Sequence, residues 1–409
     1  MKTKTSISPA PRSRDIRLDF FRGLALFIIF VAHAKMNAWA AYTPGKFGFS
    51  DSAEIFVFCS GIASALAYGR LFDERGATMC SARIAQRCWQ VYWAHIGVFF
   101  AVLAAMIGVD AWLGTGDAYL RGLDMHHAVS NDAARNLLGL MTLTYVPGLF
   151  DILPMYLVLL AMVPLVLLVS RFGKYAALAF IAVVWGIGNA KLIEIPAEPW
   201  SDRPWFFNPL AWQLVFFTGF AFARGWLPTP PVHKVAVVTA AILLVLMIPL
   251  AYDPVAVALP YGQSIRETLM PYFDKGNFGL LRYVHFLLLA YIAFALAGPA
   301  GEGLTRWQNT GWQLFVQAVS KVGSQTLPVF LSGVMLCTLA GVALNLSGNT
   351  AVATVLVNFA AFGLMIAVAY TAAWFKSSPW SAPRHAKARR ETAGEAPQTR
   401  GDTDSPLAA

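Results

Sequence analysis

Long apolar runs separated by short polar stretches dominate the hydropathy pattern of this 409-residue chain. A helix that crosses a bilayer needs about 20 mainly apolar residues, and the runs reach about that length. The pattern therefore predicts an all-α, polytopic integral membrane protein with about ten transmembrane helices. The predicted spans are residues 18–38, 50–69, 88–109, 150–170, 175–195, 206–225, 234–252, 278–298, 322–346 and 351–375.

Polar segments flank this apolar part. Residues 1–17 form a predicted basic, cytoplasmic N-terminal segment, residues 18–375 the transmembrane domain, and residues 376–409 a disordered cytoplasmic tail. Residues 132–149 and 311–321 predict amphipathic helices at the outer and inner surfaces. The run after residue 22 lacks a signal-peptide cleavage pattern, so the first span is expected to be retained.

Lysine and arginine give the predicted spans a direction. With the N-terminus inside, the cytoplasmic stretches hold 21 of these residues and the outer loops hold seven. Short cytoplasmic loops carry such an excess of positive charge. The bias predicts that both termini lie in the cytoplasm, so the number of spans is even.

The amino-acid composition is typical of a membrane protein and indicates which kinds of partner it has. Hydrophobic residues make up 57% of the chain and charged residues 13%, whereas soluble domains carry about 25% charged residues. The net charge of +9 lies in the tails and beside apolar runs. It therefore indicates contact with the lipid bilayer and no nucleic-acid partner. The four cysteines have no metal-ligand spacing, so neither a metal site nor a permanently bound cofactor is expected.

The stretch from Arg14 to His33 carries ionisable side chains into the first apolar run. Arg22 and His33 are eleven residues apart, which is close to three helical turns and about 16 Å along the axis. They are therefore predicted to share one face. Ionisable groups inside a span are costly and indicate a functional site; the alternative is a snorkelling arginine with a histidine satisfied by a neighbouring helix.

Antiparallel spans bring three carboxylates to the predicted depth of His33. Asp51 and Glu54 open the second span, and Asp151 opens the fourth. A carboxylate beside a histidine orients the ring and stabilises its protonated form, as a general base requires. Each acid also suits the N-cap of its helix, and that interpretation is preferred for Asp51.

Basic residues at the inner side form a second candidate site. Arg83 and Arg87 are four residues apart and face the same way on a helix. Together with Arg14, Arg17 and Arg22 they are suited to hold phosphate groups from the cytosol. The alternative for each arginine is contact with anionic lipid.

Other polar groups in the apolar part have a structural interpretation. His95 and His285 are expected to be satisfied inside the bundle, for example by Gln213 or Asn358, and Gly61 is expected to permit close helix packing. Aromatic residues in the outer loops suit either a membrane-interface belt or a sugar-docking platform. These are Trp112, Tyr119, Trp200, Trp205, Tyr261 and Tyr272.

Several motifs resemble those of the type-three membrane acyltransferase superfamily. They are Leu18-Asp19-x-x-Arg22-Gly23, the gap to His33, Phe56-Val-Phe-x-Ser60-Gly61 and Arg83-Ile-x-x-Arg87. More narrowly, the chain resembles the OpgC-type proteins, which succinylate osmoregulated periplasmic glucans. This likeness rests on Arg14-Asp15-x-Arg17-x-Asp19-Phe20-x-Arg22-Gly23, Glu54-Ile-Phe-Val-Phe, Tyr68-Gly69-Arg70 and Asp151-Ile-Leu-Pro-Met-Tyr156.

The resemblance implies a multi-pass enzyme of the bacterial inner membrane, with residues 18–375 as an acyltransferase-like domain. It would move an acyl group, succinyl by the likeness, from cytosolic acyl-CoA to a periplasmic glucan, beside glucan-synthesis proteins. His33 would be the catalytic base, aided by Glu54 or Asp151. Arg22 would be its partner on the donor side, with Arg17, Arg83 and Arg87. Ser81-Ala82 replace the superfamily's usual Arg-Arg pair, which leaves other acyl donors open.

Two other function classes share these features. A transporter of an acylated lipid, glycan or organic anion has the same spans, buried charges and midplane cavity. A non-catalytic scaffold in a glycan-synthesis complex would not depend on His33. Acyl transfer by the purified protein separates the enzyme from both.

Overall fold

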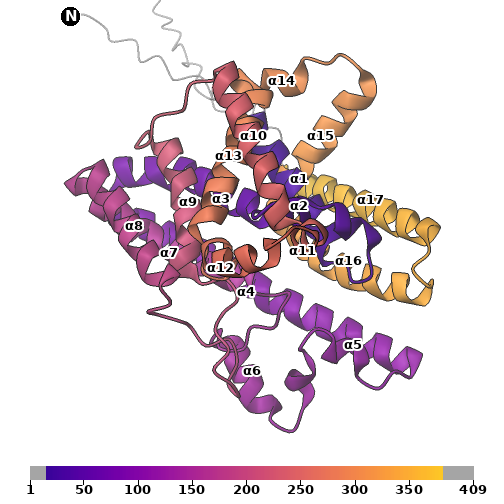
Figure 1. Ribbon diagram of the computed structural model, residues 1–409. Coiled ribbons are helices and arrows are strands. Elements are labelled where there is room, and N and C mark those ends of the chain that lie inside the picture. The colour runs from indigo at the N-terminus through magenta and orange to yellow at the C-terminus, as the bar shows by residue number, and fades with distance from the viewer. Residues whose placement is uncertain (1–14, 381–409) are drawn as a thin grey trace, which may run out of the picture.

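The structure is a computed structural model that describes residues 15–380 (Figure 1). The ends of the predicted terminal segments, residues 1–14 and 381–409, lie outside the described residues. Within 15–380 the only β structure is an isolated bridge between Pro196 and Pro204. The α-helices are α1 (Ile16–His33), α2 (Pro44–Phe47), α3 (Ser52–Ser64), α4 (Arg70–Leu113), α5 (Ala118–Arg121), α6 (Ala133–Met141), α7 (Ile152–Val169), α8 (Lys174–Asn189), α9 (Pro209–Arg224), α10 (Lys234–Ala251), α11 (Asp253–Ala258), α12 (Gly262–Phe273), α13 (Leu280–Ala297), α14 (Glu302–Thr305), α15 (Thr310–Ser324), α16 (Thr326–Leu346) and α17 (Ala351–Lys376).

The prediction of an all-helical membrane protein is confirmed, although fewer helices than predicted have the length and composition of a span. Six helical stretches of the described chain are long and apolar enough to cross a bilayer. Three predicted spans are not among the six. α8 and α9 are too short, with 16 residues each, and α1 carries three charged side chains among 18 residues. The other shortfall arises because the second and third predicted spans belong to one continuous helical stretch, Ser52–Leu113.

That stretch reverses direction in its middle. Gly76 has φ 79° and ψ 179°, which is not helical. The Sγ of Cys80 lies 3.6 Å from the carbonyl oxygen of Tyr68, whereas twelve residues of straight helix would separate them by about 18 Å. The predicted inner loop 70–87 is therefore helical, and α3 and most of α4 form a hairpin whose turn is at Gly76.

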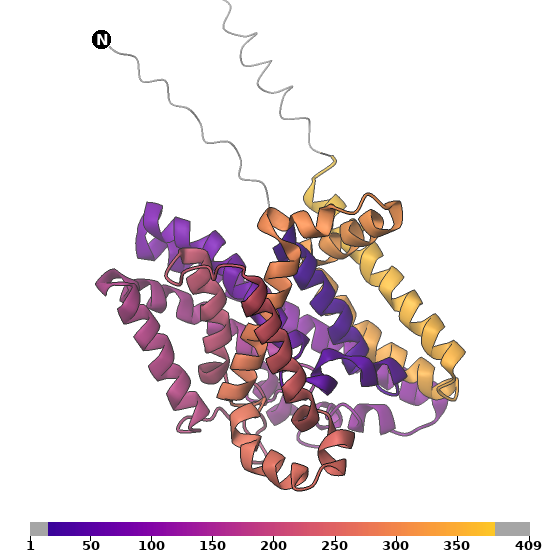
Figure 2. The same cartoon turned by 45° about the horizontal axis from the view of Figure 1, so that its top comes forward.

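Segments predicted to lie on the same side of the membrane contact one another. On the predicted inner side, Arg224 at the end of α9 forms an ion pair with Asp73. On the predicted outer side, Lys275 forms an ion pair with Asp51. The start of α1 and the end of α17 lie at the same end of the molecule (Figure 2), which an even number of crossings requires.

Glycines allow α1 and α15 to approach backbone to backbone. A Cβ on Gly23 would lie 1.9 Å from the carbonyl oxygen of Val319, and one on Gly323 would lie 1.8 Å from that of Asp19. The expected close packing at Gly61 is confirmed, because a Cβ there would lie 1.8 Å from the carbonyl oxygen of Phe216 in α9. Small residues serve this purpose at membrane helix interfaces.

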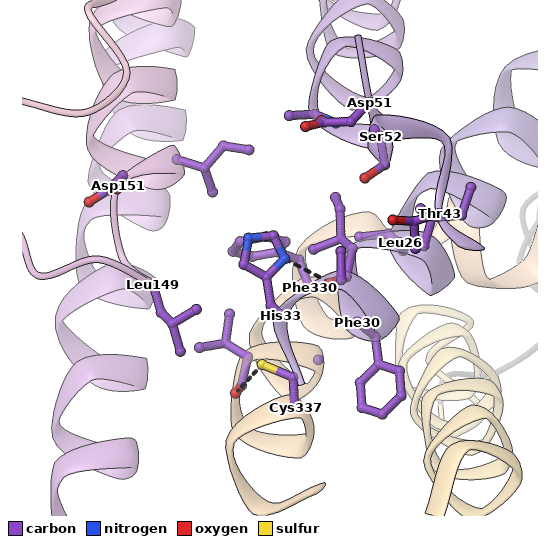
Figure 3. Close-up of a pocket in the computed structure, with 18 of the residues that line it drawn as sticks. Leu26, Phe30, His33, Thr43, Asp51, Ser52, Leu149, Asp151, Phe330 and Cys337 are labelled. Atoms are coloured by element: carbon purple, nitrogen blue, oxygen red, sulfur yellow. Dashed lines mark hydrogen bonds between the residues drawn. The ribbon is translucent and has the colours of Figure 1, made fainter. Parts of the chain in front are cut away.

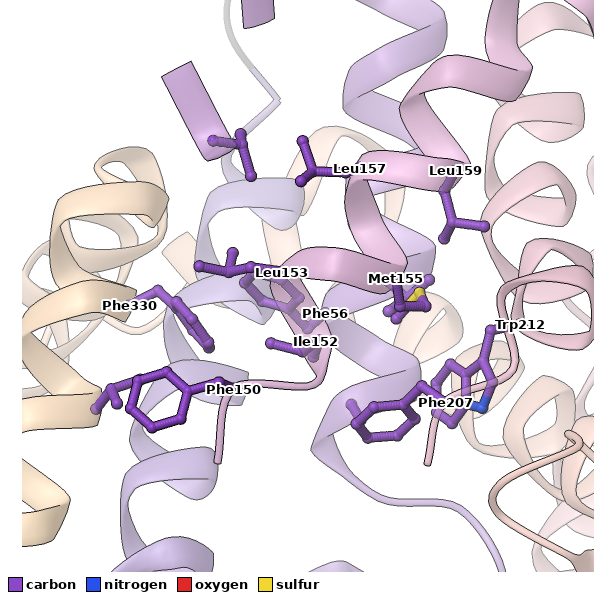
Figure 4. Close-up of a cluster of buried hydrophobic side chains, with 14 of the residues drawn as sticks. Phe56, Phe150, Ile152, Leu153, Met155, Leu157, Leu159, Phe207, Trp212 and Phe330 are labelled. Atoms are coloured by element: carbon purple, nitrogen blue, oxygen red, sulfur yellow. The ribbon is translucent and has the colours of Figure 1, made fainter. Parts of the chain in front are cut away.

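α7 runs through the apolar core, with neighbours on several sides. Leu153 and Met155 are buried on it and lie between Phe330 of α16 and Trp212 of α9 (Figure 4). Because the helix is packed so tightly, the residue just before it, Asp151, has a defined position.

The buried polar residues have partners that differ from the predicted ones. His285 Nδ1 lies 2.7 Å from the hydroxyl of Ser50. Asn358 exchanges hydrogen bonds with Asn37 after α1, and Gln213 donates to the backbone of α8. Neither amide therefore satisfies a histidine. Both ring nitrogens of His95 are buried without a hydrogen-bond partner in residues 15–380.

The predicted amphipathic surface helices are found with different lengths. α15 (Thr310–Ser324) covers the predicted inner helix 311–321. At the outer side only α6, Ala133–Met141, is helical within the predicted 132–149. The residues after α6 form an irregular segment up to Asp151, and Gly148, Leu149 and Asp151 line the cavity described below.

Candidate active site

His33 is the last residue of α1, and the local backbone sets which ring nitrogen is free. α1 begins at the N-cap Asp15, whose side chain accepts from the Arg17 amide, and ends where Ala34 becomes extended. His33 Nδ1 lies 2.8 Å from the carbonyl oxygen of Ile29. A carbonyl only accepts, so Nδ1 carries the hydrogen and Nε2 keeps its lone pair. The free nitrogen is a candidate general base.

A cavity of about 340 Å³ surrounds the His33 ring. Figure 3 shows the ring between Asp151 on one side and Asp51 with Ser52 on the other. On α1 the cavity extends from His33 to Leu26, about 10 Å along the axis. Its inner part is apolar, with Phe330 of α16 among its walls, whereas its outer part is charged.

A second cavity of about 340 Å³ also borders His33. The two cavities share His33, Leu149 and Cys337, and only the first extends inward along α1. His33 therefore lies at the junction of two spaces, an arrangement suited to bringing two substrates together.

Of the three predicted carboxylates, Asp51 is a helix cap, as preferred from the sequence. Its side chain accepts from the Ala53 amide, and Glu54 Oε2 accepts from the Asp51 amide at 2.8 Å, which completes a capping box. Asp51 also accepts from Lys275 Nζ at 2.6 Å. It lines the first cavity with His33.

Glu54 is committed to a different partner from the predicted one. It is fully buried, and its Oε1 lies 2.6 Å from Arg282 Nη1 of α13. With Oε2 bonded to the Asp51 amide, both oxygens are used. The structure thus pairs Glu54 with Arg282, and no hydrogen bond joins it to His33 within residues 15–380.

Asp151 also lines the cavity of His33, and one of its carboxyl oxygens has no hydrogen-bond partner among the described residues. It occupies the N-cap position of α7 but makes no capping hydrogen bond. Its side chain is buried, and Oδ1 has no partner among the described residues. No direct hydrogen bond between Asp151 and His33 is present in the described chain, so any pairing would require a ligand or water between them.

The cations of the first cavity were not identified from the sequence. Lys46, Lys275 and Arg282 all line it. Lys275 lies in the segment before α13, and Arg282 lies in the first turn of α13. Both are far from His33 in sequence. One sequence signal was available, because Arg282 lies inside the predicted span 278–298, where a charged residue is costly.

Two of the predicted donor-side arginines converge on Tyr156 of α7. Tyr156 is half-buried and lies within electrostatic reach of both Arg22 and Arg87. Arg83 and Arg87 both act on neighbouring Tyr68 in the same way. Arg22 forms an ion pair with Asp19 at 2.7 Å, and its Nε is unpartnered in the described chain. Arg22 and His33 both face α3 and α7, as their spacing predicts.

Arg17 lies apart from these arginines. Its guanidinium bonds Asp15 and the carbonyl of Gly298 after α13, and it lies 5.4 Å from the ring centre of Phe294. The hydrogen bonds from Arg17 hold the pKa of Asp15 below its usual value. Arg17 therefore fastens the start of α1 to α13.

Comparison with known proteins supports the resemblance seen in the motifs. A family model described as OpgC protein matches residues 14–377. The chain belongs to the OpgC family. No curated protein and no solved structure matches it. The match covers nearly all described helices, including the part beyond residue 160 where the sequence motifs are sparse. Membership in this family indicates a membrane protein and a glucan-modifying acyltransferase.

Proposed function

We propose that this protein carries an acyl group from cytosolic acyl-CoA to a hydroxyl of a periplasmic glucan, as a multi-pass enzyme of the bacterial inner membrane. The observation that carries the proposal is the position of His33. Its Nδ1 hydrogen is held by Ile29, and its ring lies where two cavities meet. A base with a defined tautomer between two binding spaces suits direct transfer between two substrates.

The chemistry needs no covalent intermediate on the enzyme. The glucan hydroxyl attacks the thioester carbonyl carbon while His33 Nε2 takes its proton. The new C–O bond forms, the C–S bond breaks, and the CoA thiolate takes the proton from the imidazolium. The products are an ester and CoA thiol. Asp151, buried in the same cavity with an oxygen that has no partner among the described residues, is the carboxyl group placed to assist the imidazolium through a bound water or hydroxyl.

The cations of the first cavity support an acyl group that carries a free carboxylate, such as succinyl. Lys275 and Arg282 are held by Asp51 and Glu54, so their positions are defined before a ligand arrives. No ion pair involves Lys46 within residues 15–380. A carboxylate gains charge-assisted hydrogen bonds from such groups, whereas an acetyl group gains none.

The donor would enter from the side of Arg22, Arg83 and Arg87. Arg22 and Arg87 are within electrostatic reach of Tyr156, and Arg83 and Arg87 are within reach of Tyr68. Arg22 lies one turn of α1 before Leu26, which lines the inner end of the first cavity. Phosphates of CoA would stay with the arginines while the pantetheine arm extends along α1 toward His33.

Purified protein in detergent tests this function. Incubated with succinyl-CoA and short glucose oligosaccharides, it should form succinyl esters that mass spectrometry detects. His33→Gln should lower kcat by about 10²–10⁴ without changing the elution profile. Absence of transfer by the wild-type protein, with net transport of the same compounds in vesicles, would favour the transporter. Full transfer by His33→Gln would refute the role of His33.

A further inference from the structure

We propose that the second cavity is the acceptor site and that it binds a neutral, hydroxyl-rich chain, that is, a saccharide, with its reacting hydroxyl toward His33. This inference rests on the proposed acyl transfer and assigns its second substrate to a location. The cavity lies at the ends of helices: its lining comes from the end of α1, the end of α4, α5 and the end of α16.

Position distinguishes the two cavities. The second cavity begins where α1 ends. In this part of the chain only His33, Lys35 and Met36 line it. It does not extend along α1 toward Arg22, as the first cavity does. Thr115 and Asn345 mark its outer boundary at the ends of α4 and α16. An acceptor from the predicted outer side reaches His33 here without crossing the path of the donor.

The polar groups of the second cavity match a saccharide. Asn345 Nδ2 donates to the Tyr119 hydroxyl at 2.8 Å, so the Tyr119 hydroxyl keeps its own hydrogen to donate. The side-chain oxygen of Asn345, Oδ1, makes no hydrogen bond in the described chain and remains to accept. Paired donors and acceptors beside an aromatic ring are suited to sugar hydroxyls and their apolar faces.

A buried carboxylate holds this part of the cavity in place. Asp110 accepts from the Thr115 hydroxyl at 2.6 Å and from the amides of Tyr119 and Leu120 at 3.1 and 3.2 Å. Asp110 is buried. The turn that carries Thr115 and Tyr119 is therefore positioned by the end of α4, so the site exists before a ligand binds.

The second cavity carries little charge, which suits a neutral ligand. Among the described residues that line the second cavity, Lys35 is the only charged side chain, and its ammonium donates to the Gly122 carbonyl. The first cavity, in contrast, is highly charged: three cations line it, Lys46, Lys275 and Arg282, together with Asp51 and Asp151. An acyl group with a free carboxylate therefore fits the first cavity, and a neutral polyol fits the second.

Filling the second cavity tests the assignment. Ala118 lines it, whereas Ala111 is exposed on α4 outside it. With succinyl-CoA and short glucose oligosaccharides, Ala118→Phe should raise the KM for the saccharide about tenfold or more, while the KM for succinyl-CoA stays within about twofold. Ala111→Phe should change neither constant. Tyr119→Phe, which removes one hydroxyl, should raise the KM for the saccharide about three- to tenfold.

The outcomes separate this inference from the proposed function. Suppose that the wild-type protein acylates the saccharide and that Ala118→Phe and Tyr119→Phe leave the KM for the saccharide unchanged. The second cavity is then not the acceptor site, whereas the transfer function stands. If wild-type protein acylates no saccharide, the proposed function itself fails. Acylation of added phosphatidylglycerol in place of saccharide would assign the cavity to a lipid headgroup and overturn the inference.

Discussion

Glu54 and Arg282, 228 residues apart in sequence, form a buried ion pair with 2.6 Å between Oε1 and Nη1. The pair joins α3 to α13, and Glu54 is at the same time a member of the capping box with Asp51. It therefore holds the charged wall of the His33 cavity together. Glu54, expected from the sequence to assist the histidine, instead positions Arg282, one of the cations that line the cavity of His33.

Breaking this pair should destabilise the protein. Removing one partner of a buried pair leaves an uncompensated charge, at a typical cost of about 3–5 kcal/mol. We expect Arg282→Met to lower the thermal unfolding temperature in detergent strongly. The double variant Glu54→Gln with Arg282→Met should recover much of that loss. A double variant no more stable than Arg282→Met alone would contradict the pairing.

The cations of the first cavity should set the choice of acyl donor. Lys46→Met and Lys275→Met remove ammonium groups that are available to a free carboxylate. Each should lower kcat/KM for succinyl-CoA about tenfold relative to acetyl-CoA, because only succinyl carries the second carboxylate. The ratio of the two rates is the measurement, and exposed Lys191→Met is the control. An unchanged ratio would remove the support for a dicarboxylic acyl group.

Arg83 and Arg87, which lie within electrostatic reach of Tyr68, should act on the phosphates of the donor. A variant with both Arg83→Ala and Arg87→Ala should raise the KM for acyl-CoA about tenfold, since each phosphate contact contributes a charge-assisted bond. The KM for acyl-pantetheine, which lacks those phosphates, should stay the same. Arg121→Ala, at an exposed site on α5, is the matched control. Equal effects on both donors would argue for a structural role.

Close packing of α1 on α15 should be sensitive to a single methyl group. Gly323→Ala places a Cβ 1.8 Å from the Asp19 carbonyl oxygen, so the helices must separate. Overpacking of this kind costs about 1–3 kcal/mol, and the shift would move Arg22 with α1. Thermal unfolding should show the loss. Gly97→Ala inside α4, which has no heavy atom within 4 Å of its Cβ, should not lower the unfolding temperature, because alanine favours a helix interior over glycine.

Much of the fold was predictable because it depends on local sequence. Apolar runs define membrane helices wherever they lie, and helical periodicity places Arg22 and His33 on one face. The cap at Asp51 was likewise expected, since a cap is made with residues two or three positions away. The family is evident in the motifs of residues 14–160 for the same reason.

Four features required the tertiary structure. The reversal at Gly76 lies inside a continuous helical stretch, where the apolar pattern predicts only a loop. Arg282 of α13 forms an ion pair with Glu54 of α3, and Asn37 forms hydrogen bonds with Asn358 of α17. The fourth feature is the second cavity, which exists only because the ends of α1, α4 and α16 meet around His33.

The sequence alone therefore determined the class of protein, its family and the histidine at its centre. The tertiary structure decided which carboxylates and which cations line the cavity of His33, and that a second cavity adjoins it. The physical reason is distance along the chain. Hydropathy, caps and helix faces arise within a few turns, whereas ion pairs and cavities depend on helices that are hundreds of residues apart and on how their side chains pack.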